Sequence, residues 1–153
     1  MANRLKYLVL HCTATPKGRE VTAEQIRHWH TDPVSKGGRG WRQVGYTDMI
    51  HLDGSVERLV DNNEDNNVDP WEITNGAKGY NNVSRHVVYV GGGTSPQGED
   101  TRTEAQRKSL VEYVLRFHEK HPSVRIIGHN EIAGKACPSF DVPGFLREIG
   151  IVQ

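Results

Sequence analysis

The sequence has 153 residues, with 19 Lys and Arg balanced by 19 Asp and Glu, so the formal net charge is zero. A neutral chain has no single-sign electric field to attract a polyanion, which argues against nucleic acid or an anionic membrane as the main partner. No apolar run approaches the roughly 20 residues of a membrane-spanning helix, and the length suits one domain over residues 1–153 with its own core.

The first half of the chain predicts three strands and a helix. Tyr7–His11 is an apolar run ending in histidine and predicts a buried strand. Thr22 and Gln25 have the spacing of a capping box, which opens a helix through about His30. Residues 44–52 and 55–60 predict a hairpin, because Asp-Gly between two such runs is a strong signal for a turn with positive φ at both residues.

Residues 61–69, rich in Asn, Asp and Glu, predict a solvated loop. Side chains from Asp61 to Glu72 also follow the spacing of a calcium-binding loop. However, Asn66 stands where that loop requires Gly, and a predicted strand precedes the loop instead of a helix. We therefore favour a plain polar loop over a calcium site.

The second half predicts two strands and two helices. Residues 86–90 are nearly all strand formers, and Thr103 begins a second capping box whose helix ends near His121. Residues 124–127 predict another buried strand, and a short last helix follows Asp141. We therefore expect a mixed α/β fold: a central mixed β-sheet flanked by about three helices in a single domain.

Two histidines stand where predicted strands end. His11 closes the first strand, and His129 follows the strand at residues 124–127. If these strand ends are neighbours, a loop can bring the thiolate of Cys137 beside the two imidazoles, and these are ligand types that zinc favours. Two cysteines are too few for a disulfide framework. Because Cys12 directly follows His11, strand alternation turns it to the opposite face as a small core residue.

The other six histidines have structural interpretations, from helix faces, from a helix C-terminus or from strand interiors. They are His28, His30, His51, His86, His118 and His121.

Five motifs occur in order between about residue 7 and residue 146. They are Val9-Leu10-His11-Cys12-Thr13-Ala14-Thr15, Arg39-Gly40-Trp41 with Val44-Gly45-Tyr46, Ala77-Lys78-Gly79-Tyr80-Asn81, Val90-Gly91-Gly92, and Gly128-His129 with Lys135-Ala136-Cys137-Pro138. Together they resemble the zinc-dependent N-acetylmuramoyl-L-alanine amidases of the phage-lysozyme and peptidoglycan-recognition-protein family. The likeness covers nearly the whole chain.

The resemblance implies a site as well as a fold. Matched residue by residue, the family's zinc ligands fall on His11, His129 and Cys137, its catalytic tyrosine on Tyr46 and its catalytic lysine on Lys135. One Zn²⁺ per chain would then lie in a surface groove, and three protein ligands leave an open position for water, as at catalytic zinc sites. The bond to be cut is the amide between N-acetylmuramic acid and L-alanine in bacterial peptidoglycan.

Chemistry gives each remaining residue an expected role. The ammonium group of Lys135 can stabilise the oxyanion of the tetrahedral intermediate. Tyr46 can position the water or assist proton transfer to the leaving amine, although a free phenol with a pKa near ~10 is a poor base. We expect Trp41 and Asn81 to line the groove wall as substrate-binding residues.

Two departures from the family pattern affect the surroundings of the metal. Family members commonly carry His directly after the tyrosine, where this chain has Thr47, and often carry His at the position of Gly76. Neither position is a ligand, so metal binding is retained. The sequence does not identify the groups that orient the ligands, and the reaction rate depends on those groups.

Two other functions remain as alternatives. The first is a non-catalytic peptidoglycan-binding module, which loss of the zinc-binding cysteine would favour. The second is a cysteine hydrolase using Cys137 and His129, whose activity would survive chelators. We expect a monomer whose partner is peptidoglycan. Since residues 1–10 lack a secretory h-region, we expect cytoplasmic synthesis without a signal peptide, followed by action on the cell wall after release during phage or prophage lysis.

Overall fold

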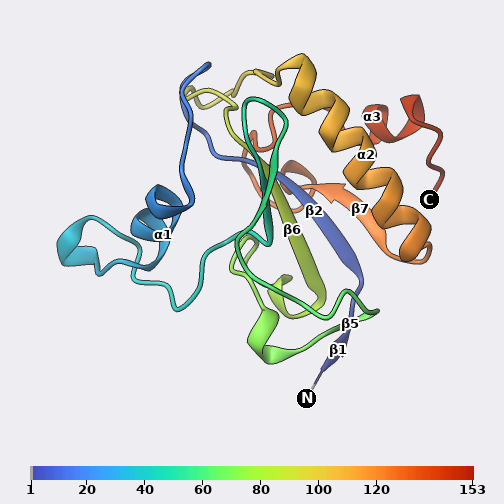
Figure 1. Cartoon of the computed structure of the whole chain (residues 1–153), viewed down its shortest axis with the longest axis horizontal. Helices are drawn as coiled ribbons and strands as arrows, with labels where there is room; N and C mark the ends of the chain where they lie inside the picture. The colour runs from blue at the N-terminus through green and yellow to red at the C-terminus, as the bar shows by residue number, and fades with distance from the viewer. Residues whose placement is uncertain (1) are drawn as a thin grey trace.

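A five-stranded mixed sheet runs through the computed structural model, which describes residues 2–153 (Figure 1). The strand order is β4-β3-β6-β2-β7. In that order the strands are β4 (Val56–Arg58), β3 (Asp48–Ile50), β6 (Ser84–Tyr89), β2 (Tyr7–Cys12) and β7 (Arg125–Gly128). All neighbouring pairs are parallel except β3 and β4. The expected mixed α/β fold is confirmed.

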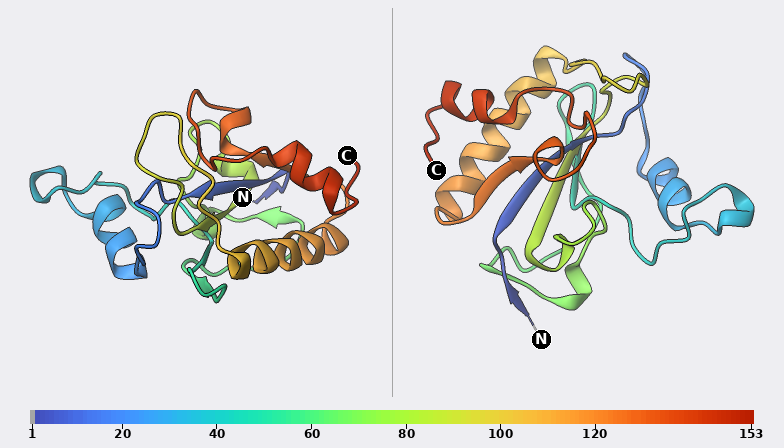
Figure 2. Two further views of the ribbon diagram at one scale, coloured as in Figure 1. Left: turned by 90° about the horizontal axis from the view of Figure 1, so that it is seen from above. Right: turned by 180° about the vertical axis from the view of Figure 1, so that it is seen from behind.

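Within residues 2–153, three α-helices accompany the sheet: α1 (Ala23–Thr31), α2 (Glu104–Lys120) and α3 (Val142–Glu148). Figure 2 shows α1 on the far side of the molecule from α2 and α3. Both predicted capping boxes are present, with the Thr22 and Thr103 side chains accepting the backbone N–H of the residue three positions on. Four short 3₁₀ helices cover Val34–Lys36, Pro70–Glu72, Asn81–Val83 and His129–Glu131.

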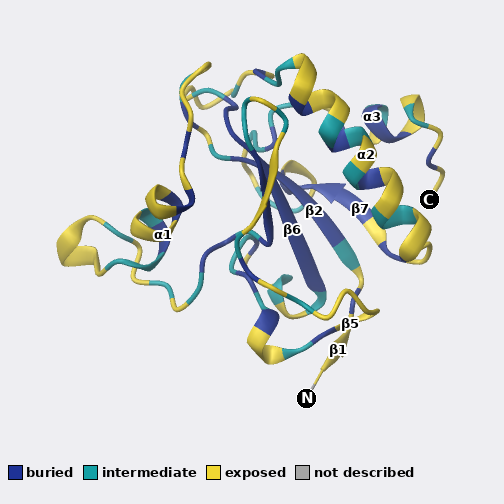
Figure 3. Ribbon diagram, in the orientation of Figure 1, coloured by how far each residue is buried: buried dark blue, intermediate teal, exposed yellow. Residues whose placement is uncertain are grey.

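The two faces of the sheet bury different sets of side chains. Leu8, Leu10 and Cys12 of β2 pack in one cluster with α2 and α3, so the predicted core position of Cys12 is confirmed. On the other face, Met49 and Val88 pack with α1. Figure 3 shows β2, β6 and β7 buried along most of their length. None of the helices in residues 2–153 is long and apolar enough to cross a membrane.

The predicted strand at residues 44–52 is only three residues long in the structure. The backbone before β3 makes other contacts, because the Gly45 N–H donates to Nδ1 of His30 and the Asn75 N–H donates to the Val44 carbonyl. The hairpin is present, but its turn is wider than a two-residue Asp-Gly turn: the His51 N–H donates to the Ser55 carbonyl at 2.8 Å, and only Gly54 of the Asp-Gly pair has a positive φ, +86°.

The predicted solvated loop contains a strand. β5 (Asn67–Val68) pairs with β1 (Asn3–Arg4) in a separate two-stranded sheet, and Val68 is buried against Leu5 and Val124. In the same loop, Asp61 pairs with Arg58 at 3.2 Å and Asp65 with Arg85 at 3.7 Å. These carboxylates point at arginines and not at a common centre, which supports the polar loop over the calcium site.

The parallel strands bring the predicted ligands together. β2 and β7 are neighbours, with Leu10 opposite Gly128 in the register. The next residue along the chain is His11 after Leu10 and His129 after Gly128. Because the two strands are parallel, both histidines lie at the same edge of the sheet. The strand ends are neighbours, as the sequence predicts.

Candidate metal centre

His11 and His129 place their imidazole rings side by side at this edge, with ring centroids 4.7 Å apart. Both residues are buried. Burial lowers the pKa of each imidazole, and the nearby charge of Lys135 adds to the effect. Both rings are therefore neutral at pH 7, and a neutral imidazole has the lone pair that a metal ion requires.

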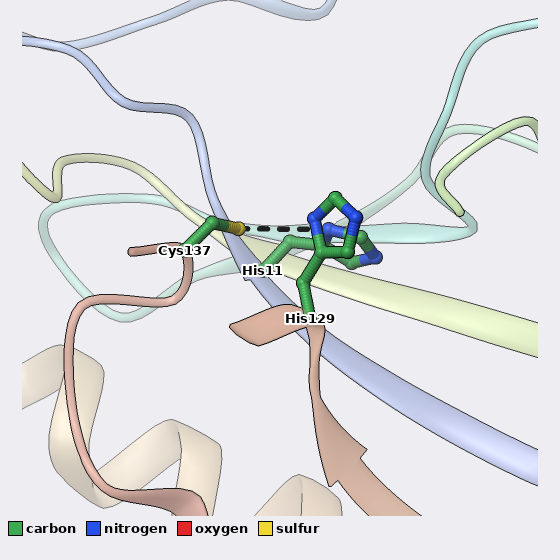
Figure 4. Close-up of side chains that lie close together, drawn as sticks. All are labelled: His11, His129 and Cys137. Atoms are coloured by element: carbon green, nitrogen blue, oxygen red, sulfur yellow. Dashed lines mark hydrogen bonds between the residues drawn. The ribbon is translucent and has the colours of Figure 1, made fainter. Parts of the chain in front are cut away.

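Cys137 reaches the two histidines from the loop that follows β7 (Figure 4). Its Sγ accepts the Cys12 N–H at 3.2 Å and lies 3.7 Å from Nδ1 of His11. The Tyr89 hydroxyl of β6 donates to the Pro138 carbonyl at 2.6 Å and holds the loop next to the sheet. A hydrogen bond with the Cys12 thiol, followed by burial, raises the pKa of Cys137. A cation beside the sulfur would act in the opposite direction and favour the thiolate.

The donor set fits zinc. One ligand atom from each of His11, His129 and Cys137 lies within 4.8 Å of the other two, and no other such cluster of His, Cys, Asp or Glu occurs within residues 2–153. Two atoms bound to one tetrahedral zinc ion lie roughly 3.4–3.8 Å apart, so the cluster needs only small movements to close on an ion. Two imidazoles and one thiolate are ligands for zinc rather than for calcium or magnesium.

A groove of about 280 Å³ opens over this cluster. It is lined by the three candidate ligands together with Tyr46, Lys135 and Trp41. The Tyr46 ring lies 5.3 Å from the His11 ring, and Lys135 is exposed at the rim. Arg39 places its guanidinium 5.0 Å from the Trp41 ring, so one wall of the groove combines a cation with an aromatic surface.

Asn81, expected in the groove wall, lies outside the groove lining. Its side-chain Oδ1 accepts the Ala77 N–H at 2.8 Å and contacts Nε2 of His86 at 3.1 Å. The structure thus places Asn81 behind the cluster and not in contact with the groove.

His86 is the residue at this site that the sequence does not predict. Its Nδ1 lies 2.8 Å from Nε2 of His11, it is fully buried, and burial lowers its pKa to about 3. A residue in the middle of a strand looks structural, and only the pairing of β2 with β6 brings it to His11. The signal in the sequence is weak: two strand histidines that share a face once the register is known.

A larger cavity of about 530 Å³ lies on the α2 side of the molecule. It is lined by ion-paired residues such as Asp48, Arg58 and Arg85, and none of the clustered His and Cys side chains borders it. Within residues 2–153 no His, Cys, Asp or Glu cluster able to hold a metal ion borders this cavity, so we assign the candidate functional site to the smaller groove.

Known proteins are similar to this chain in sequence and in fold. The chain matches the family Amidase_2, described as N-acetylmuramoyl-L-alanine amidase, over residues 1–140. The endolysin of Escherichia phage T7 is 35% identical over 136 residues, which cover 88% of this chain and 81% of that endolysin.

Solved structures extend the comparison. The Ph2119 endolysin from Thermus scotoductus MAT2119 bacteriophage Ph2119 has a TM-score of 0.73 at 27% identity, covering 99% of this chain and 88% of the other. Bumblebee PGRP-SA shares the fold, with a TM-score of 0.63 at 20% identity over 90% of this chain and 80% of its own. Since the family match covers most of the sequence and the phage T7 endolysin is similar along most of its length, this chain belongs to the Amidase_2 family and is an N-acetylmuramoyl-L-alanine amidase.

Proposed function

We propose that this amidase hydrolyses peptidoglycan with one zinc ion held by His11, His129 and Cys137, as a phage endolysin-like enzyme. Family membership defines the bond, which is the amide between N-acetylmuramic acid and L-alanine. The observation that carries the metal proposal is the convergence of these three side chains, from two neighbouring strand ends and one loop, beneath a groove. When bound, zinc supplies Lewis-acid chemistry, which activates water and polarises a carbonyl group.

Lys135 stabilises the negative charge that develops on the amide carbonyl oxygen. Its side chain lines the groove two residues before Cys137. A cation next to a developing oxyanion lowers the energy of the transition state, and this effect is larger in a groove than in bulk water. The ammonium group therefore acts in the transition state more than in the binding of substrate.

Tyr46 acts as a hydrogen-bond donor in this proposal. Burial of its phenol, with the nearby cysteine sulfurs, raises the pKa of Tyr46 above its ordinary value. A phenol that keeps its proton at neutral pH can orient water or donate a hydrogen bond to the leaving nitrogen. It does not serve as the general base that abstracts a proton from water.

Trp41 forms the groove wall against which the substrate packs, and His30 supports it. The His30 ring lies 4.8 Å from the Trp41 ring and 5.3 Å from the Tyr46 ring. Because Nδ1 of His30 accepts the Gly45 N–H at 2.9 Å, the backbone before Tyr46 is fixed as well. This packing places both aromatic rings on the same wall.

Release to the cell wall completes the proposal. The phage T7 relative is named an endolysin. We propose that this chain, a monomer, likewise acts on the cell wall once lysis gives it access.

The test is mass analysis of muropeptides from purified peptidoglycan digested with the zinc-loaded enzyme. A new free L-alanine amino terminus on the stem peptide is expected, its formation stopping with a chelator and returning with zinc. Products that form equally in excess chelator would favour the cysteine hydrolase. Peptidoglycan that binds but stays intact would favour a binding module.

A further inference from the structure

A chain of hydrogen bonds, buried at His86 and partly buried at Asn81, runs from a backbone amide to the candidate metal centre. The Ala77 N–H donates to Oδ1 of Asn81 at 2.8 Å. Nε2 of His86 lies 3.1 Å from the same oxygen, and Nδ1 of His86 lies 2.8 Å from Nε2 of His11. The remaining nitrogen of His11, Nδ1, is the one that faces Cys137.

The direction of every bond in this chain follows from its first member. A backbone N–H can only donate, so the Asn81 atom it meets is the carbonyl oxygen, which can only accept. His86 must then donate from Nε2 and, as a neutral ring, accept at Nδ1. His11 must therefore carry its proton on Nε2, which leaves the Nδ1 lone pair free towards Cys137.

The space around Gly76 shows why this imidazole comes from β6. A Cβ atom on Gly76 would lie 2.6 Å from Nδ1 of His86 and 2.5 Å from the Gly45 carbonyl oxygen. Position 76 is therefore closed to any side chain, because the His86 ring and the Gly45 carbonyl fill the adjoining volume. The imidazole that contacts His11 comes from β6 instead of from this loop.

We propose that His86 and Asn81 are positioning residues that fix the tautomer and ring orientation of His11, so that Nδ1 is presented to the metal. This inference rests on the proposed zinc centre at His11, His129 and Cys137. Asn81 then acts through His86, which gives it a role other than the substrate contact that its place in the sequence motif suggests.

Removal of His86 should have the effect of removing the hydrogen-bond partner of a metal-ligating histidine. A ligating histidine that donates its second N–H is held in one orientation and is more basic, and loss of such a partner costs about 10–100-fold in metal affinity. His86→Leu removes both hydrogen-bonding nitrogens at similar volume. His86→Asn keeps an oxygen where Nδ1 stood, so it still accepts from His11.

The test is zinc affinity measured by chelator competition at pH 7, independent of catalysis. We expect His86→Leu to weaken zinc binding by about 10–100-fold, and His86→Asn to remain within a few-fold of the parent. Asn81→Leu should weaken binding less, since His86 keeps its contact with His11. His51→Leu is the control, a histidine outside the groove lining, and should leave the affinity unchanged.

Two outcomes separate failure of this inference from failure of the zinc proposal. A parent protein that binds no zinc ends the zinc proposal itself. A parent that binds one zinc ion while His86→Leu binds it equally well overturns the positioning role alone. Nitrogen-15 correlation spectra of the parent protein give a check that needs no variant. A His11 ring protonated on Nδ1 in the metal-free protein would contradict the proposed chain of hydrogen bonds.

Discussion

Two polar clusters in this molecule use opposite chemistry. On the α2 side, the Asp48 carboxylate accepts from Nε of Arg58 at 2.7 Å and from the Tyr113 hydroxyl at 2.6 Å. We call these three residues the ionic cluster. At the end of β2, the histidine cluster of His11, His86, His129 and Cys137 contains no carboxylate.

The difference lies in what each cluster still lacks. In the ionic cluster a buried negative charge already meets a cation and a hydroxyl donor, so its interactions are satisfied internally. In the histidine cluster, both nitrogens of His86 are already paired with His11 and Asn81. His11, His129 and Cys137 still offer three donor atoms close together, which a single cation would satisfy. Cavity volume alone would select the ionic cluster, because it borders the larger cavity.

The largest expected effect comes from Cys137→Ala. This change removes one of the three proposed ligands, and the two remaining imidazoles would be too few donors for a stable catalytic site. Zinc content and turnover should therefore be lost together. Metal analysis of the dialysed protein, alongside release of free L-alanine termini, measures both. A variant with full zinc and full turnover would contradict the ligand assignment.

Lys135→Ala is expected to separate chemistry from metal binding. In the proposed mechanism its ammonium group stabilises charge in the transition state, and removal of one such group costs about 10²–10³ in rate. Zinc content should equal that of the parent protein. Steady-state rates on purified peptidoglycan measure the loss, and Lys108→Ala, outside the groove lining, serves as the control. An unchanged rate for Lys135→Ala would remove this residue from the mechanism.

The proposed zinc ligands can be predicted from the sequence because their signal is local. His11 and His129 each follow an apolar strand, and parallel strands deliver their ends to one edge. The position of His86 is not local. It depends on the β2–β6 register, in which Val9 lies opposite His86, and a shift by one residue would turn its ring to the other face.

The same reasoning explains where the predicted elements differ from the observed fold. β1 and β5 have two residues each, too few for any periodic pattern, and their pairing is supported by buried contacts of Leu5 and Val68. The shortening of β3 arises from the His30 side chain, which takes the Gly45 N–H out of the sheet. In both regions, contacts between residues far apart in the sequence determine the strands.

Arg58→Met tests the ionic cluster and should change stability without changing the metal. The Asp48 side chain is only 5% exposed, so it would keep a charge with one hydroxyl donor. Breaking a fully buried pair costs roughly 3–5 kcal/mol. Because Arg58 is 37% exposed, we expect about 1–3 kcal/mol less unfolding free energy.

Urea unfolding measures this loss. Arg116→Met, an exposed arginine on the same cavity, is the matched control and should cost far less. Zinc affinity should stay at the parent value in both variants. A fall in zinc affinity with Arg58→Met would mean that the two clusters are coupled through the sheet.

The smallest expected effect is pH-dependent and involves His51, whose two ring nitrogens contact Glu20 at 2.9 Å and Glu57 at 2.8 Å. Burial lowers its pKa, but the hydrogen bonds and charges of the two glutamates outweigh burial, so the net shift is upward. A pKa raised by folding stabilises the protein below the unfolded value near ~6.5, and this contribution is lost as the pH rises through the folded value.

His51→Gln should therefore lose more stability at pH 5.5 than at pH 8.5. Since both glutamates are almost half exposed, the difference should stay below about 1 kcal/mol. Paired urea curves at the two pH values measure it, and Glu20→Gln should remove part of the same difference. An equal loss at both pH values would show that His51 contributes packing alone. Unlike the histidines at the end of β2, the His51 ring lies between two carboxylates. These carboxylates favour a protonated ring, whereas the neutral rings at the end of β2 are suited to bind a metal ion.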